Sequence, residues 1–319
     1  MTSLNTSLNG WSFHPFPAFA PTLYPNTAFW NASNPSKNLT YQIQLSWPFS
    51  WSSSPNLASN KSALTMYVLD GNALGTTAAD AFKRRPPPPA SQPDGLVVSI
   101  GYPLTDSVYA ISQRAVDFSP PLPTPGQTPP SGADEFLAFI SKTLRPWVRK
   151  KIFPSVTFKR DALYGHSFGG LFVVYALISQ PDAFDTFLAA SPSLYWNRGY
   201  ILDEVSNRLG SLAGSSTTPV GLWPIGLNLS QPAVVISYGD VEQFPVRRRK
   251  ETEAEFQARK RTISTRFNST MTVSCHDLFD RIKGSGKVRD VVLKEYAGQE
   301  HNSVAASAIT DGLEYFIDW

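Results

Sequence analysis

Cysteine is almost absent from the sequence: Cys275 is the single cysteine among 319 residues. One cysteine excludes a disulfide within the chain, which is typical of a protein from a reducing compartment. Cys275 is followed by His276, a pair that suggests thiol chemistry, but adjacent residues on a helix point in different directions. We therefore expect Cys275 to be a packed residue of the protein interior.

Excess charge of one sign is also lacking, because the net charge is only +3. The basic run at residues 247–250 (RRRK) is followed by Glu251, Glu253 and Glu255, which cancel its field. We interpret this run as a solvated helix face, and we expect no nucleic-acid partner.

A long apolar run is missing as well. No stretch reaches the roughly 20 residues that cross a membrane, so no membrane partner is expected. Residues 1–10 contain neither a basic start nor an apolar core, so we expect no signal peptide. Six N-x-[ST] sequons would suit a secreted protein, but a chain rich in Ser and Thr also forms them by accident. We expect the protein to be cytoplasmic.

Short apolar runs bounded by turn residues alternate with helical patterns along the chain. Such strands indicate a mostly parallel sheet with helices on both faces. The alternating run at 41–48 predicts an antiparallel edge strand, with the residues before it outside the sheet. The expected strands cover 41–48, 63–70, 95–103, 160–164, 186–191, 233–239 and 291–296, and the expected helices cover 132–151, 168–180, 197–209, 302–317 and one or two segments within 246–284.

No boundary between domains is evident. We expect one domain over residues 1–319, with a proline-rich loop at 118–130 and a helical insertion at 246–284.

The most informative stretch is Gly165-His166-Ser167-Phe168-Gly169, which fits the pattern G-x-S-x-G. The end of an apolar strand precedes it and an apolar helix follows it. A sharp strand-to-helix turn exposes a serine hydroxyl at the mouth of a sheet. The glycines are needed because a Cβ there would collide with a neighbouring element. The sequence therefore predicts Ser167 as a nucleophile.

A serine hydroxyl needs a base, and only four histidines are present. His14 lies before the predicted sheet, and His166 is expected to point away from Ser167. His276 lies in the helical insertion, whereas His301 follows the last predicted strand. In α/β-hydrolases the base lies in the loop after the final strand, which selects His301.

The acid that orients the base should follow the strand at 233–239, where Asp240 and Glu242 compete. A G-x-x-[DE] turn, which many hydrolases carry here, selects Glu242. Two backbone N–H groups should hold the developing negative charge, those of Phe168 and Asn72, with Gly71 giving the chain its tight turn.

Several motifs are spaced along the chain, at 67–72 (YVLDGN), 113–120 (QRAVDFSP), 165–172 (GHSFGGLF), 189–196 (AASPSLYW) and 300–301 (EH). Together they resemble the esterase family of α/β-hydrolases that contains the enterobactin and salmochelin esterases. The resemblance spans roughly residues 40–319. The length of the chain and the long insertion before His301 look most like fungal intracellular siderophore esterases.

The resemblance implies an α/β-hydrolase fold with a mostly parallel sheet of about eight strands. It implies Ser167 as nucleophile and His301 as base, but leaves the acid open, because some relatives use a Ser–His pair alone. Arg114 and Trp196 correspond to family positions near the site. Arg114 would contact an anionic or carbonyl-rich substrate or pair with Asp117, and Trp196 would form a wall of the pocket or belong to the core.

The resemblance also implies a substrate: the ester bonds of a hydroxamate siderophore, of the triacetylfusarinine C or fusarinine type, opened to release iron. No paired Cys or His occur at metal-ligand spacing, so we expect no metal site and no cofactor, and iron enters with the substrate. Two alternatives stay open, a general carboxylesterase or thioesterase for small acyl groups, and a hydrolase-fold protein that binds a ligand without turnover.

Overall fold

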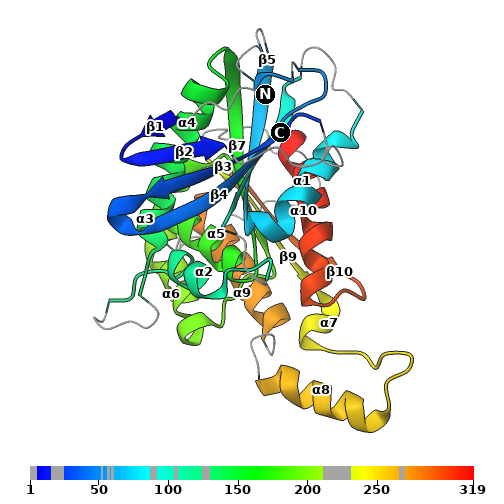
Figure 1. The fold of residues 1–319 in the computed structure, drawn as a ribbon. Helices are drawn as coiled ribbons and strands as arrows, with labels where there is room; N and C mark the ends of the chain where they lie inside the picture. The colour runs from blue at the N-terminus through cyan, green and yellow to red at the C-terminus, as the bar shows by residue number, and fades with distance from the viewer. Residues whose placement is uncertain are drawn as a thin grey trace. The chain divides into compact units, whose positions relative to one another are not determined.

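The computed structural model describes residues 6–15, 25–51, 53–55, 58, 61–86, 92–103, 107–123, 130–210, 231–265 and 270–319. Figure 1 shows the helices and strands of the chain, coloured from the N-terminus to the C-terminus. The chain divides into two compact units. The first contains Met1–Tyr164 and Ile309–Trp319, and the second contains Gly165–Ala308. The expected single domain over 1–319 stays a prediction.

The first unit is built on strands that hydrogen-bond in the order β1-β2-β3-β4-β6-β5-β7. The four strands from β1 to β4 pair antiparallel, as do β4 and β6, whereas β5 pairs parallel with β6 and β7. The last two residues of β7 belong to the second unit. The strands are β1 (Thr6–Leu8), β2 (Trp11–Pro15), β3 (Thr27–Asn34), β4 (Leu39–Ser46), β5 (Lys61–Leu69), β6 (Asp94–Gly101) and β7 (Val156–His166).

The expected edge strand is present as β4, but the expectation that it forms the edge is wrong. Three further strands, β1 to β3, continue the sheet beyond it, and His14 lies on β2. On β2 the side chains of Trp11 and Phe13 are buried and alternate with more exposed ones. This pattern is too short to predict a strand from sequence, since β2 has only five residues, and β3 carries three Asn and Ser side chains in its second half, although Asn is uncommon in strands.

Helices of the first unit include the one expected at 132–151, which is a nearly continuous helical run with two π-helical segments. Pro146 lies between these segments and has no N–H to donate, which accounts for the irregular turns around it. Two helices, α1 and α2, were not expected. The helical segments are η1 (Pro35–Lys37), α1 (Gly71–Lys83), α2 (Ile111–Asp117), α3 (Ala133–Ala138), η3 (Phe139–Leu144), α4 (Arg145–Trp147) and η4 (Val148–Ile152).

The second unit contains three parallel strands, in the order β8-β9-β10. Its helix α5 is buried from Gly169 to Ile178, as its apolar sequence predicts. The insertion expected at 246–284 forms two helices, α8 and α9, and Cys275 is buried on α9 as expected. The elements are β8 (Thr186–Ala190), β9 (Ala233–Gly239), β10 (Asp290–Tyr296), α5 (Phe168–Ser179), η5 (Pro181–Ala183), η6 (Trp196–Gly199), α6 (Tyr200–Leu209), α7 (Asp240–Gln243), α8 (Glu253–Thr265), α9 (Met271–Ser285) and α10 (His301–Ile317). The residues of α10 from Ile309 onward are assigned to the first unit.

The described residues thus confirm an α/β fold, with the additional strands at the N-terminal end. Within the proline-rich loop expected at 118–130, residues 124–129 lie outside the described residues, as do 266–269 within the insertion. Among the helices that the structure describes, none combines the length and the apolar character needed to cross a membrane.

Candidate active site

Ser167 lies in a sharp turn between β7 and α5, with a backbone φ of 58° and ψ of −116°. A positive φ is uncommon for a residue with a side chain, and it costs about 1–3 kcal/mol. Neighbouring glycines make the turn possible. A Cβ on Gly165 would lie 2.3 Å from the carbonyl oxygen of Gly169, and one on Gly170 would lie 2.9 Å from that of Ala190. The predicted strand–turn–helix geometry is therefore present at the predicted serine.

His301, the first residue of α10, lies beside Ser167 although 134 positions separate them in the sequence. Its Nε2 is 2.9 Å from Ser167 Oγ, and its Nδ1 is 2.6 Å from Glu242 Oε2. A carboxylate only accepts hydrogen bonds, so the hydrogen of the neutral imidazole belongs on Nδ1. Nε2 is then free to accept the proton of the serine hydroxyl.

Glu242 is fully buried as a side chain, and three donors surround its carboxylate. Besides His301, the N–H of Gly239 donates to Oε1 at 2.8 Å and the hydroxyl of Ser191 donates to Oε1 at 2.6 Å. These donors supply the hydrogen bonds that a buried polar group needs. The carboxylate is therefore held by its surroundings in the orientation that meets the imidazole.

The competing carboxylate, Asp240, does not approach the imidazole in this way. Its Oδ1 accepts a hydrogen bond of 2.7 Å from the N–H of Gly298, in the loop that leads to His301. The same loop passes close to the end of β9, because a Cβ on Gly239 would lie only 2.0 Å from the carbonyl oxygen of Gln299. Glu242 thus faces the base, whereas Asp240 holds the loop that carries it.

His166 has a structural link to the base that sequence reasoning missed. Its Nε2 lies 2.8 Å from the backbone carbonyl oxygen of His301, and the two imidazole rings are 4.6 Å apart between centroids. The side chain is buried, at 3% exposure. The one available signal was its position next to Ser167.

The serines of the segment 189–196 were missed as well. Ser191 is buried, has a positive φ of 40° and donates to Glu242. Ser193 Oγ lies 3.5 Å from Ser167 Oγ, a long contact, and accepts a hydrogen bond of 3.2 Å from the hydroxyl of Tyr195. The motif AASPSLYW, quoted for the family resemblance, was the signal that marked them.

The two expected oxyanion donors belong to different units. Phe168 is the first residue of α5 in the second unit, so its N–H is among the four that open the helix. Asn72 is the second residue of α1 in the first unit, where its side chain hydrogen-bonds Gln42 and both backbone groups of Tyr102. Their role as a pair stays a prediction.

Arg114 forms a bidentate ion pair with Asp70, through Nε at 2.9 Å and Nη2 at 2.7 Å. The suggested pair with Asp117 is therefore wrong, since that carboxylate accepts hydrogen bonds from other groups. Burial raises the pKa of Asp70, and the guanidinium opposes the rise. Asp70 meets the guanidinium with both of its oxygens, and this bidentate geometry is stronger than a single hydrogen bond.

Trp196 lies on η6 and is partly exposed, with its ring 6.4 Å from that of Tyr200. It is therefore not a fully buried core residue, and its contact with a substrate stays a prediction. In the described part of the chain, no group of three or more His, Cys, Asp or Glu side chains is arranged to hold a metal ion.

The strained serine, the imidazole and the buried carboxylate on an α/β scaffold define the class of the protein as a carboxylic ester hydrolase. A family model described as "Putative esterase" matches residues 97–269. The chain belongs to this esterase family.

Relatives cover nearly the whole chain. A "Siderophore enterobactin esterase" of Emericella nidulans is 38% identical, over 96% of this chain and 97% of the relative. A "Siderophore triacetylfusarinine C esterase" of Aspergillus fumigatus is 34% identical, over 94% and 96%. Among solved structures, siderophore hydrolase EstB from Aspergillus nidulans matches with a TM-score of 0.80 at 34% identity, covering 95% of this chain and 99% of that one.

Proposed function

We propose that the protein is a serine esterase that hydrolyses the ester bonds of a siderophore, with a hydroxamate of the triacetylfusarinine C or fusarinine type as its substrate. The observation that carries the chemistry is the hydrogen-bonded series from Ser167 through His301 to Glu242. The substrate class is supported by the names of the relatives, which specify siderophore esters.

In the proposed reaction, Ser167 Oγ attacks an ester carbonyl carbon while His301 Nε2 accepts the hydroxyl proton. Glu242 keeps the hydrogen on Nδ1 and stabilises the imidazolium that forms. The imidazolium then donates its Nε2 proton to the leaving alcohol oxygen, and Ser167 is left acylated. A water molecule, activated by the same imidazole, attacks the acyl group, releases the carboxylic acid and restores the serine.

We assign the stabilisation of the tetrahedral oxyanion to the N–H groups of Phe168 and Asn72. Such donors are effective because they are already oriented when the charge develops. The position of Phe168 at the opening of α5 adds the positive end of the helix dipole. Arg114 and Trp196 are proposed as substrate-side residues on the basis of the family positions that they match.

No cofactor takes part in this scheme, and any iron enters and leaves with the siderophore. We propose the cytoplasm as the place of action, where cleavage of the ester ring would weaken the hold on the iron. A catecholate siderophore is a second candidate substrate, because the relative at 38% identity is named an enterobactin esterase.

The experiment is a direct comparison of substrates. The protein is incubated with ferric triacetylfusarinine C, with ferric enterobactin and with nitrophenyl butyrate. Ring opening of the two siderophores is followed by mass spectrometry, and hydrolysis of nitrophenyl butyrate by the release of nitrophenol. We expect cleavage of the fusarinine-type ring at the highest kcat/KM. Preference for enterobactin would select the second candidate, and cleavage of nitrophenyl butyrate alone would identify a general esterase.

A covalent serine probe separates an enzyme from a ligand-binding protein. We expect labelling of the wild type and no labelling of Ser167→Ala. Ser193→Ala is the matched control, since Ser193 is also buried near the site but is not hydrogen-bonded to the imidazole in the described structure. Labelling of Ser167→Ala, or absence of labelling of the wild type, would contradict the proposed chemistry.

A further inference from the structure

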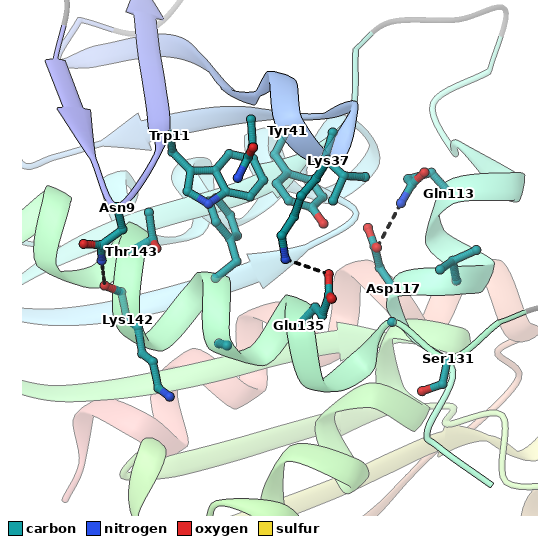
Figure 2. A pocket seen from close by; sticks show the side chains of 16 residues that line it. Asn9, Trp11, Lys37, Tyr41, Gln113, Asp117, Ser131, Glu135, Lys142 and Thr143 are labelled. Carbon is teal, nitrogen blue, oxygen red and sulfur yellow. Dashed lines mark hydrogen bonds and ion pairs between the residues drawn. The ribbon is translucent and has the colours of Figure 1, made fainter.

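The first unit contains a cavity of about 520 Å³, which Figure 2 shows from close by. Cavities of a few hundred Å³ are of the size that binds small organic molecules. None of Ser167, Glu242 and His301 lines it. Its walls come from β2, β3, η1, β4, α2, α3 and η3 and from the segments beside them, all within residues 9–143.

Aromatic side chains form one wall of the cavity. The rings of Trp11 and Tyr41 stack with centroids 5.6 Å apart, and the ring of Phe139 lies 4.6 Å from Trp11 and 4.7 Å from Tyr41. All three side chains are largely buried, so mutual packing holds the wall in place. A flat or apolar ligand body would find a preformed surface here.

A buried carboxylate, that of Asp117, lines the same cavity. Asp117 is only 3% exposed, and it accepts hydrogen bonds of 3.0 Å from the hydroxyl of Tyr102 and from the amide of Gln113. Among the described residues it forms no ion pair with a Lys, Arg or His side chain. Burial raises the pKa of Asp117 to about 6, although these donors and the hydroxyl of Tyr41, which also hydrogen-bonds the carboxylate, oppose the rise.

Among the described residues, the other charged groups that line the cavity do not pair with Asp117. Lys37 reaches across to Glu135 and pairs with it at 3.0 Å (Figure 2). The ammonium group of Lys142 points away from the cavity, while its backbone carbonyl accepts a hydrogen bond from Asn9 (Figure 2). A buried anion without a counter-ion is costly, and a cationic ligand would relieve this cost.

We propose that this cavity binds a small organic cation, an ammonium or guanidinium group on an apolar or aromatic body, with the cation against Asp117 and the body along Trp11 and Tyr41. The carboxylate supplies the charge partner, and the aromatic rings supply apolar contact and cation–π attraction. The site is separate from the ester chemistry, so it does not depend on the proposed function.

The sign of the pH dependence follows from the carboxylate. A bound cation favours ionised Asp117 and lowers its pKa. The affinity for the cation is therefore highest above the pKa of Asp117 in the ligand-free protein, and it falls as the pH drops through about 6. The groups that face Asp117 are Tyr41, Tyr102, Gln113 and Glu135. Burial raises the pKa of both tyrosines, so they stay neutral over this range. Arg114, on the same helix, is held by Asp70, and Glu135 by Lys37.

The test is isothermal titration calorimetry of the full-length protein with phenethylammonium, and with 2-phenylethanol as a neutral ligand of similar shape. We expect phenethylammonium to bind at least tenfold more tightly than the alcohol. At pH 5, a carboxyl with a pKa of about 6 is only about one-tenth ionised, so the affinity should be about tenfold weaker than at pH 7.5.

Two variants localise the binding. Asp117→Asn keeps the shape and removes the charge, and should weaken phenethylammonium at least tenfold while leaving 2-phenylethanol unchanged. Asp134→Asn, an exposed position on α3, is the matched control and should bind as the wild type does. Equal affinity for the two ligands, no pH dependence, or no binding at millimolar concentration would overturn the proposal. The wild-type comparison decides it even if Asp117→Asn fails to fold.

Discussion

The buried ring of His166 contacts the backbone of the base, and replacing it tests whether that contact positions the imidazole. His166→Phe keeps a ring of similar size against His301 but removes the Nε2–H that donates to the carbonyl at 2.8 Å. His166→Gln keeps a donor at a similar reach and removes the ring. The two variants therefore separate hydrogen bonding from packing.

The size of the effect follows from the lost hydrogen bond. A net contribution of about 1 kcal/mol corresponds to about fivefold in rate. An imidazolium at His166 would repel that of His301 by about 3–4 kcal/mol at an effective dielectric constant of 20, given centroids 4.6 Å apart. A neutral donor is thus required in the transition state, and glutamine provides one.

The assay is steady-state hydrolysis of a nitrophenyl ester, with kcat and KM determined separately. We expect kcat of His166→Phe to fall at least fivefold with KM unchanged, because the contact holds the base and not the substrate. His166→Gln should recover most of the loss. His276→Phe removes another histidine hydrogen bond, to Tyr238, and should leave kcat unchanged. A kcat of His166→Phe within twofold of the wild type, or equal losses in Phe and Gln variants, would refute the reasoning.

Three further predictions concern the acid, the loop and the ion pair. Glu242→Gln should lower kcat by about a hundredfold or more, since the imidazole loses its charged partner; a loss below about tenfold would indicate a Ser–His pair. Gly239→Ala should destabilise the protein by about 1–3 kcal/mol in denaturant unfolding, because its Cβ meets the Gln299 carbonyl, and an unchanged midpoint would contradict this contact. Arg114→Leu should destabilise by about 3–5 kcal/mol, and Asp70→Asn in the same chain should restore part of it; a raised KM with unchanged stability would instead indicate substrate contact.

The nucleophile and the base were predictable from sequence because their signals are local. The turn around Ser167 needs glycines at fixed offsets between a strand and a helix, and this spacing can be read directly from the sequence. His301 followed from its place after the last strand. The choice between Glu242 and Asp240 was harder, because both follow β9 within three residues. The two carboxylates are distinguished by a contact between residues 58 positions apart: the N–H of Gly298 donates a hydrogen bond to Asp240, which leaves Glu242 to face the imidazole.

Long-range pairs and short strands were the parts that sequence reasoning could not supply. Arg114 meets Asp70 across 44 positions, whereas the nearby Asp117 looked like the natural partner. The strands β1 to β3 are stabilised by pairing with one another and by packing such as Phe13 on Trp147, with ring centroids 4.1 Å apart. The intrinsic preference of these residues for the strand conformation contributes little, so neither periodicity nor β-propensity predicts the three strands.

Unusual backbone positions in the second unit explain why sequence motifs located the active site, whereas hydrophobic periodicity did not. Ser167 and Ser191 both have positive φ, and Gly165 and Gly239 both lie where a Cβ would clash with backbone. Such positions cannot be filled by the residues that regular strands and helices prefer, so the sequence must depart from those patterns there. Each departure fixes a group of the site: the hydroxyl of Ser167, the donor to Glu242, or the close passage of the loop that carries His301. The backbone strain is therefore concentrated at Ser167 and Ser191, where the orientation of the reacting groups matters most, and a Cβ added at Gly239 should displace the loop that carries His301.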